Sequence, residues 1–265
     1  MEHALSCWEK TKGQFGGKHL ILFLDYDGTL APIAATPDKA VLPRETKALL
    51  LKLRKSAACS IMIVSGRSLA DVKKRVGLPG ITYVGNHGLE VEGPGIKSQS
   101  PVPPSCRVVM GKITRELERR LSSVPGVVVE DKTLTISVHY RLAPPKALRA
   151  IRKDVVGVVG PHVREKKVRL TRGKKVFEIK PLRGWDKGKM VEWLLARQYF
   201  LLGERPIGSI YIGDDVTDED AFKALADKGL TVFVGRPAAT VARCYLRDTG
   251  EVRRFLEEVL AERRI

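Results

Sequence analysis

Hydrophobic and polar residues alternate in blocks over the first third of the chain, in a way that predicts alternating strands and helices. His19 to Asp25 is a continuous apolar run that ends in polar residues, as expected for a central parallel strand buried on both faces. Residues 43–55 have helical spacing with proline at the start. Apolar runs at 61–64 and 81–84 flank a short amphipathic segment, 69–76. This β-α-β-α-β order predicts a doubly wound parallel sheet.

The pattern changes after residue 92. Residues 93–105 are rich in Pro, Gly and Ser and predict a linker. The next stretch predicts an α-β-β-α-β-β unit. Its elements are a basic helix at 106–122, strands at 126–130 and 133–141, a helix from about 144, and strands at 162–170 and 174–180. The first pattern then resumes, with a helix at 186–202 and strands at 210–212 and 231–234. We therefore predict an α/β doubly wound core, residues 1–96 and 181–265, with an inserted α+β cap domain over 97–180.

Charge is distributed unevenly over these parts. The 265 residues carry 47 Lys and Arg against 30 Asp and Glu, a net charge of +17, which divides into +5 for 1–104, +12 for 105–180 and 0 for 181–265. Such an excess fits a solvated basic surface, or a partner that is a nucleic acid, an anionic membrane or an acidic small ligand. Only 6% of the residues are aromatic, so base-stacking platforms are scarce, and we expect neither nucleic acid nor membrane as a partner.

Cysteine usage and hydropathy bear on the compartment. The four cysteines are far apart and form no CxxC pair, which argues against zinc and thioredoxin-type sites. The most apolar run, residues 20–24, is too short to cross a bilayer, and the first residues lack a secretory leader pattern. We expect a cytoplasmic protein.

Reactive side chains follow the predicted strands, where open α/β sheets bind ligands. Asp25 and Asp27 follow the first strand, and Gly28 lets the chain turn, so that one carboxylate can attack while the other manages a proton. A calcium loop does not fit, because its fifth, sixth and twelfth positions are Thr, Leu and Thr here.

Three further groups have both a catalytic and an ordinary interpretation. Ser65-Gly66-Arg67 can cradle a phosphate or simply precede a capped helix. Lys187, in Asp186-Lys187-Gly188, can neutralise a phosphoryl oxygen or belong to a plain helix start. The acids of 214–220 follow a buried strand and suit a hard cation such as Mg²⁺, and Asp214 and Asp218 meet if a helix begins there.

Taken in order, these motifs resemble the four motifs of haloacid-dehalogenase-type phosphatases, and the resemblance covers nearly the whole chain. Within that superfamily, the fuller strings are similar to trehalose-6-phosphate phosphatases: LDYDGTLAPI, IVSGR, GNHGLE, ISVHYR, KKVFEIKP, GWDKG and YIGDDVTDEDAF. The resemblance implies a Mg²⁺-dependent phosphatase that releases phosphate from trehalose 6-phosphate through an aspartyl phosphate. It also makes a trehalose-phosphate synthase a candidate partner.

The resemblance assigns roles residue by residue. Asp25 is the nucleophile, and Asp27 protonates the leaving oxygen and then activates water. Ser65 and Lys187 steady the phosphoryl oxygens beside Gly66 and Arg67. The metal site comprises Asp25, the backbone carbonyl of Asp27, Asp214 and the nearby Asp218. The sugar-binding candidates lie at the hinge and in the cap: Asn86, His87, Gly88, Glu90, His139, Arg141, Lys174 and Glu178.

The cap assignments rest on strand alternation and leave alternatives open. Ser137, His139 and Arg141 share one face of a predicted strand, as do Lys174 and Glu178, and each set can be either a sugar site or a solvated face. The same catalytic residues would also serve a sucrose-phosphate or mannosyl-3-phosphoglycerate phosphatase. A nucleic-acid-binding protein and a silent regulatory domain are the alternatives from other classes, but no key catalytic residue is missing. If the basic cap steers a dianionic substrate, kcat/KM should fall as salt rises.

Overall fold

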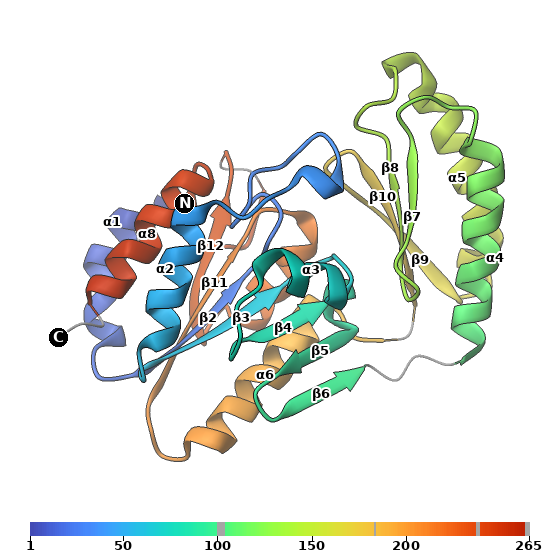
Figure 1. The fold of residues 1–265 in the computed structure, drawn as a ribbon. Helices are drawn as coiled ribbons and strands as arrows, with labels where there is room; N and C mark the ends of the chain where they lie inside the picture. The colour runs from blue at the N-terminus through green and yellow to red at the C-terminus, as the bar shows by residue number, and fades with distance from the viewer. Residues whose placement is uncertain (100–103, 183, 237–238, 263–265) are drawn as a thin grey trace. The chain divides into compact units, whose positions relative to one another are not determined.

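The computed structural model describes residues 1–99, 104–182, 184–236 and 239–262 (Figure 1). The chain forms two compact units. One, the core unit, comprises Met1–Gln99 and Trp185–Ile265, and the other, the inserted unit, is Ser100–Gly184. The sequence-based boundaries, 97 and 180, each cut into a strand, because β6 (Ile96–Gln99) belongs to the core unit and β10 (Val176–Pro181) to the inserted unit.

The core unit is built on a nine-stranded sheet with the order β1-β13-β12-β11-β2-β3-β4-β5-β6. The pairs from β1 to β4 are parallel, and β5 and β6 are antiparallel additions at one edge. The strands other than β6 are β1 (Glu2–His3), β2 (His19–Leu24), β3 (Cys59–Val64), β4 (Thr82–Gly85), β5 (Glu90–Gly93), β11 (Ile207–Gly213), β12 (Gly229–Val234) and β13 (Cys244–Leu246).

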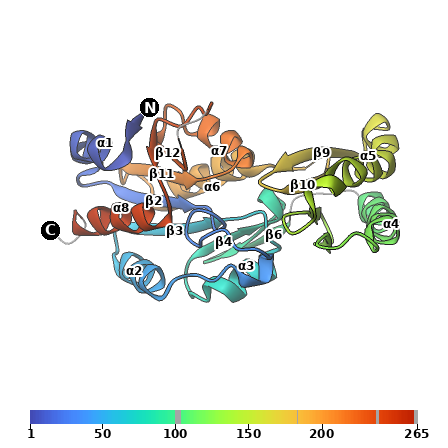
Figure 2. The ribbon, with the colours of Figure 1, turned by 90° about the horizontal axis from the view of Figure 1, so that it is seen from above.

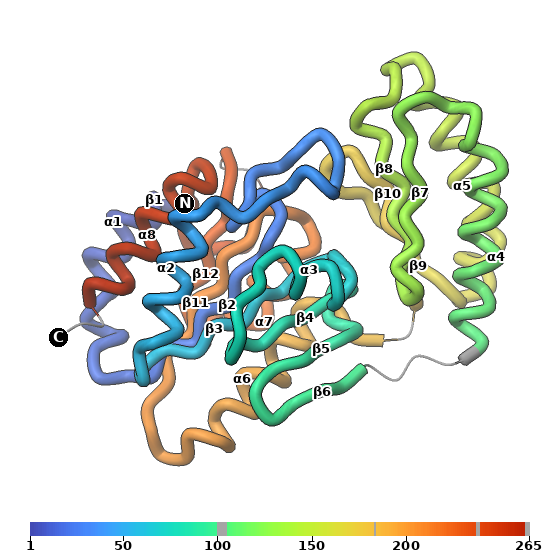
Figure 3. Tube along the Cα trace, viewed as in Figure 1, coloured from blue at the N-terminus to red at the C-terminus, as the bar shows by residue number. Residues whose placement is uncertain are grey.

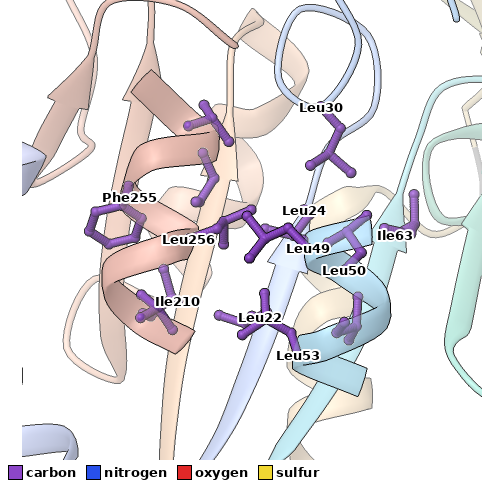
Figure 4. Close-up of a cluster of buried hydrophobic side chains, with 14 of the residues drawn as sticks. Leu22, Leu24, Leu30, Leu49, Leu50, Leu53, Ile63, Ile210, Phe255 and Leu256 are labelled. Atoms are coloured by element: carbon purple, nitrogen blue, oxygen red, sulfur yellow. The ribbon is translucent and has the colours of Figure 1, made fainter. Parts of the chain in front are cut away.

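Helices cover both faces of this sheet (Figure 2). One face carries α1 (Ala4–Thr11), α2 (Arg44–Lys55), α3 (Leu69–Val76) and α8 (Thr249–Ala261), and the other carries α6 (Lys187–Leu202) and α7 (Glu219–Ala224). Strand β2 is therefore buried on both sides: Leu22 and Leu24 pack with α2 and α8 (Figure 4), whereas Ile21 and Phe23 face the α6 side. This confirms the predicted doubly wound core.

The first and last helices, α1 and α8, lie side by side toward one edge of the sheet (Figure 3). Strand β1 pairs in parallel with β13. Trp8 of α1 packs edge-on against Phe255 of α8, with ring centroids 5.6 Å apart. None of these elements was predicted from the sequence pattern.

The inserted unit is a four-stranded antiparallel sheet with two helices. Its strand order is β7-β8-β10-β9, with β7 (Val128–Asp131), β8 (Ile136–His139) and β9 (Val168–Gly173). Helices α4 (Pro104–Leu121) and α5 (Leu148–Arg164) share one hydrophobic cluster with inward residues of the sheet, Ile136, Val138, Phe177 and Ile179. The alternate residues of β8 and β10 lie on the other face.

Two sequence predictions are wrong in detail. The predicted linker over 93–105 contains the end of β5 and all of β6, because Pro94 and Gly95 form the turn of a hairpin; residues 100–103 lie outside the described part. The predicted strand at 162–170 begins only at Val168, since α5 continues to Arg164. Among the described residues, no helix has the length and hydropathy needed to cross a membrane.

Candidate active site

Three buried carboxylates gather at the carboxyl ends of two central strands. Strands β2 and β11 are parallel neighbours, and the Asp25 N–H donates to the carbonyl of Ile212 at 2.9 Å. Asp25 follows β2, and Asp214 and Asp218 follow β11. Each of the three offers a carboxylate oxygen within 4.8 Å of the other two. The sequence expectation that Asp214 and Asp218 meet is confirmed, because the Asp214 N–H donates to Asp218 Oδ2 at 3.1 Å.

Lys187 is the cation of this cluster. Its Nζ donates to Asp25 Oδ1 at 2.6 Å and to Asp218 Oδ1 at 2.7 Å, and the lysine is 2% exposed. The side chain of Asp186 caps α6 by accepting the N–H of Lys189, which fixes where the helix begins and so where Lys187 points. Burial opposes the ammonium charge, but the nearby Asp218 and Asp25 raise the pKa of Lys187 well above its ordinary value.

Asp218 is held on all sides by hydrogen bonds. Oδ1 accepts from Lys187 and from the Tyr211 hydroxyl, at 2.7 and 2.6 Å, and Oδ2 accepts the N–H groups of Asp214 and Asp215, at 3.1 and 3.0 Å. A carboxylate offers about four lone-pair positions, and these four donors occupy them. The arrangement favours Asp218 as an organiser of the site, and makes the side chains of Asp25 and Asp214 the candidate cation ligands.

The electrostatics of the cluster fit a divalent cation. Burial, together with the charges of Asp218 and Asp214, raises the pKa of Asp25 well above 3.8, although Lys187 opposes the shift. If ionised, three carboxylates and one ammonium carry a formal charge of −2. A cation that prefers hard oxygen ligands would balance that charge. These residues therefore form a candidate metal site.

Gly28 lies directly against Asp214, which follows the neighbouring strand β11, so that there is no space for a side chain at position 28. Its φ of 84° lies in the left-handed region, and a Cβ there would lie 2.1 Å from Asp214 Oδ2. The loop after β2 thus passes directly against the acid of β11, and only glycine permits this.

The side chain of Asp27 is held by Arg67. Arg67 Nε and Nη2 donate to the two carboxylate oxygens of Asp27 at 2.7 and 2.6 Å, and Nη1 donates to Asp71 at 2.7 Å. Nη2 also reaches the carbonyl of Pro37, and the guanidinium lies over the Tyr26 ring. Arg67 is 6% exposed, whereas the Asp27 side chain is 41% exposed. Arg67, expected at the phosphate, is instead engaged in holding Asp27.

Ser65 lies at the end of β3, and its Oγ accepts the N–H of Arg67 at 3.1 Å. It is not the helix cap, because Ser68 caps α3. Gly66 leaves space for His87, whose ring would be 2.4 Å from a Cβ at that position. Asn86 and His87 have φ of 49° and 58°, a strained conformation typical of functional turns.

The other sugar-binding candidates of the core unit lie in the turn between β4 and β5 and contact one another. Glu90 accepts hydrogen bonds from the Asn86 side chain, at 2.6 Å, and from the N–H of Leu69, at 3.3 Å. Gly88 has φ of 103°, and a Cβ there would lie 2.5 Å from the carbonyl of Asp186. The turn between β4 and β5 therefore packs against the start of the helix that carries Lys187.

In the inserted unit, β-sheet register places three polar residues in one row. Glu130 pairs with Ser137, and Ser137 with Glu178. Ser137 donates to Glu178 at 2.7 Å and accepts from Lys132 at 2.7 Å. His139 bonds Glu130 at 2.9 Å. The expected grouping of Ser137 and His139 on one face is confirmed.

Arg141 and Lys174 lie outside the strands, contrary to the alternation expected from the sequence. Arg141 follows the end of β8, and Lys174 lies in the turn between β9 and β10, where Lys175 has φ of 68°. Arg141 Nη2 donates to the Lys174 carbonyl at 2.7 Å, so both reach the same turn.

Sequence reasoning missed several members of these networks: Tyr211, Asp71, Glu130 and Lys132. Only Asp71 left a signal, because it lies four residues after Arg67 in a predicted helix. The others come together through strand register and loop paths.

Comparison with known proteins gives a consistent result. A family model described as trehalose-phosphatase matches residues 23–243. The chain is 38% identical over 260 residues to "Probable trehalose-phosphate phosphatase 4" of Oryza sativa subsp. japonica, covering 96% of this chain and 69% of that protein. It is also 38% identical to a trehalose-phosphate phosphatase of Mycobacterium tuberculosis (strain H37Rv), covering 92% and 62% respectively, so it spans less than two thirds of that relative.

Solved structures share the fold. The C-terminal domain of the Candida albicans trehalose-6-phosphate phosphatase superposes with a TM-score of 0.79 at 25% identity, covering 94% of this chain and 93% of that one. A haloacid dehalogenase-like hydrolase from B. subtilis, 14% identical, gives 0.59, covering 90% of this chain and 99% of that one, and supports the fold alone.

Proposed function

The chain belongs to the trehalose-phosphatase family, and from this premise we propose that it hydrolyses trehalose 6-phosphate to trehalose and phosphate. The observation that carries the proposal is the buried cluster of Asp25, Lys187 and Asp214 at the ends of β2 and β11. Phosphoryl transfer depends mainly on positioning and charge stabilisation, and these residues supply a nucleophile, a cation and a metal ligand.

In the proposed first step, a carboxylate oxygen of Asp25 attacks phosphorus. The bond between phosphorus and the sugar oxygen breaks, and Asp27 gives its proton to that oxygen. In the second step, Asp27 takes a proton from water, and the resulting hydroxide attacks the aspartyl phosphate. The bond between Asp25 and phosphorus breaks, so that free Asp25 is regenerated and inorganic phosphate is released.

The other groups stabilise charge. Lys187 lies 2.6 Å from Asp25 Oδ1, close enough to reach an oxygen of the transferring group. The Ser65 hydroxyl, whose oxygen accepts the N–H of Arg67, would donate to another. Asp25, Asp214 and the backbone carbonyl of Asp27 would hold Mg²⁺, which when bound would neutralise charge on the phosphoryl oxygens.

We assign sugar recognition to the inserted unit, because its polar row offers both charge signs in a hydrogen-bonded array. A disaccharide presents many hydroxyls, each of which can donate and accept, so acids and lysines on one sheet face suit it. The cytoplasm is the expected compartment, and no disulfide joins the four cysteines, all of which lie in the described part of the chain. A trehalose-phosphate synthase stays a candidate partner.

A phosphate-release panel with Mg²⁺ tests the assignment. Trehalose 6-phosphate should be hydrolysed with a kcat/KM well above those for sucrose phosphate, mannosyl-3-phosphoglycerate and glucose 6-phosphate. Glu178→Gln should lower kcat/KM for trehalose 6-phosphate and leave p-nitrophenyl phosphate nearly unchanged. Equal rates across the panel would rule out specificity for trehalose 6-phosphate, but they would still support phosphatase activity.

A further inference from the structure

Tyr211 is a buried aromatic residue of β11 whose hydroxyl group enters the catalytic cluster. The side chain is fully buried, and its hydroxyl donates to Asp218 Oδ1 at 2.6 Å. That same oxygen accepts from Lys187 at 2.7 Å. Tyrosine and lysine therefore share one acceptor atom.

Packing fixes where this hydroxyl lies. The Tyr211 ring stacks on Phe23 of β2, with centroids 6.3 Å apart, and meets Phe222 of α7 edge-on at 5.6 Å. The backbone of Tyr211 is held in register between β2 and β12, opposite Phe23 and Thr231. Neither the ring nor the strand can move without disturbing the core.

Lys187 is divided between two acids at nearly equal distances, 2.6 Å to Asp25 and 2.7 Å to Asp218. In such an arrangement, the acid with fewer other donors attracts the ammonium group more strongly. Asp218 has three other donors, of which the Tyr211 hydroxyl alone shares the oxygen that binds Lys187. By donating to Asp218 Oδ1, the hydroxyl group partly satisfies the hydrogen-bonding capacity of that atom and so weakens its attraction for the Lys187 ammonium group.

We propose that Tyr211 is a positioning residue that, through Asp218, keeps Lys187 directed at Asp25 and at the phosphoryl group bound there. This inference rests on the proposed phosphatase chemistry of the site but not on the identity of the sugar. Without the hydroxyl group, Asp218 Oδ1 binds Lys187 more strongly and draws its ammonium group away from the reacting oxygens.

Tyr211→Phe tests this, since it keeps the packed ring and removes only the hydroxyl. Tyr83→Phe is the matched control, because among the described residues that buried hydroxyl bonds only the backbone of Leu78, by donating at 2.7 Å and accepting at 2.9 Å. With p-nitrophenyl phosphate as the reporter, Tyr211→Phe should lower kcat about tenfold and change KM by less than about threefold, as expected when one hydrogen bond that orients a catalytic group is lost.

A second readout does not require turnover. Calorimetry with inorganic phosphate should show weaker binding to Tyr211→Phe than to Tyr83→Phe, because Lys187 no longer faces the anion. If both variants lose thermal stability alike but retain wild-type kcat and phosphate affinity, Tyr211 is only a core residue and the inference is overturned. If the wild type hydrolyses p-nitrophenyl phosphate but not trehalose 6-phosphate, the sugar assignment fails while this comparison stands. If the wild type shows no turnover at all, the proposed function fails, and the calorimetric comparison alone decides the role of Tyr211.

Discussion

Replacing Arg67 by methionine would isolate the contribution of the residue that holds Asp27. The guanidinium makes four hydrogen bonds, two to Asp27 and one each to Asp71 and the Pro37 carbonyl. Breaking a buried ion pair costs about 3–5 kcal/mol. The side chains of Asp27 and Asp71 are 41% and 29% exposed and can regain water, so we expect a loss of about 3 kcal/mol, the low end of that range.

The kinetic consequence depends on the leaving group. Correct placement of a general acid is worth about 10²- to 10⁴-fold when the leaving oxygen is a poor one, such as a sugar alkoxide. p-Nitrophenolate departs without needing a proton. Arg67→Met should therefore lower kcat/KM about 100-fold for trehalose 6-phosphate and less than about tenfold for p-nitrophenyl phosphate. The ratio kcat/KM is the right measure, because it reports only the steps up to formation of the aspartyl phosphate.

Arg75→Met is a closely matched control. Arg75 also makes four hydrogen bonds, two to Asp71 and two to the carbonyls of Asp38 and Ala40, but none of them involves Asp27. It should cost similar stability, measured by urea unfolding, with no selective loss on the sugar phosphate. Equal losses on both substrates in Arg67→Met, or the same selectivity in Arg75→Met, would refute the reasoning.

Three further outcomes follow from the geometry. Asp25→Asn should abolish turnover. Without metal it should also raise Tm increasingly as the pH rises above 3.8 but not near pH 3.5, because burial raises the pKa of Asp25 and the cost of ionising it in the folded state is absent below its ordinary value. A Tm difference that does not change with pH would contradict this. Gly28→Ala should weaken Mg²⁺ activation, because the new Cβ meets Asp214, whereas Gly17→Ala, also at positive φ but with open space around it, should leave activation unchanged. At constant free Mg²⁺, kcat/KM should fall as ionic strength rises if the basic inserted unit steers the substrate, and a flat profile would assign that charge to ordinary surface.

The sequence predicted those parts of the molecule where pattern and chemistry coincide. Residues 20–24, just before Asp25, are all apolar because β2 is buried on both faces, and a strand of this kind places its following acids at the ligand-binding edge. Periodicity failed where turn residues lie inside structure: Gly93 to Gly95 resembled a linker, yet they close the β5–β6 hairpin. Pro161 lies inside α5, which continues to Arg164 and so into the segment that was predicted as a strand from residue 162.

Contacts between distant segments left no signal in the sequence. Arg67 and Asp27 follow different strands, and nothing in either motif indicates that the arginine holds the acid. Similarly, Glu130 and Ser137 share a row only because the β7–β8 turn sets that register. These pairings depend on the assembled tertiary structure, which local pattern does not encode.

The adjacency of β2 and β11 has a consequence for folding kinetics. These strands are neighbours in the sheet, yet β2 ends at Leu24 and β11 begins at Ile207, with the whole inserted unit between them. Closing so long a loop is slow, and a compact inserted unit shortens the chain that must be closed. The pair that brings Asp25 to Asp214 should therefore form late, so that recovery of activity during refolding trails recovery of helical signal.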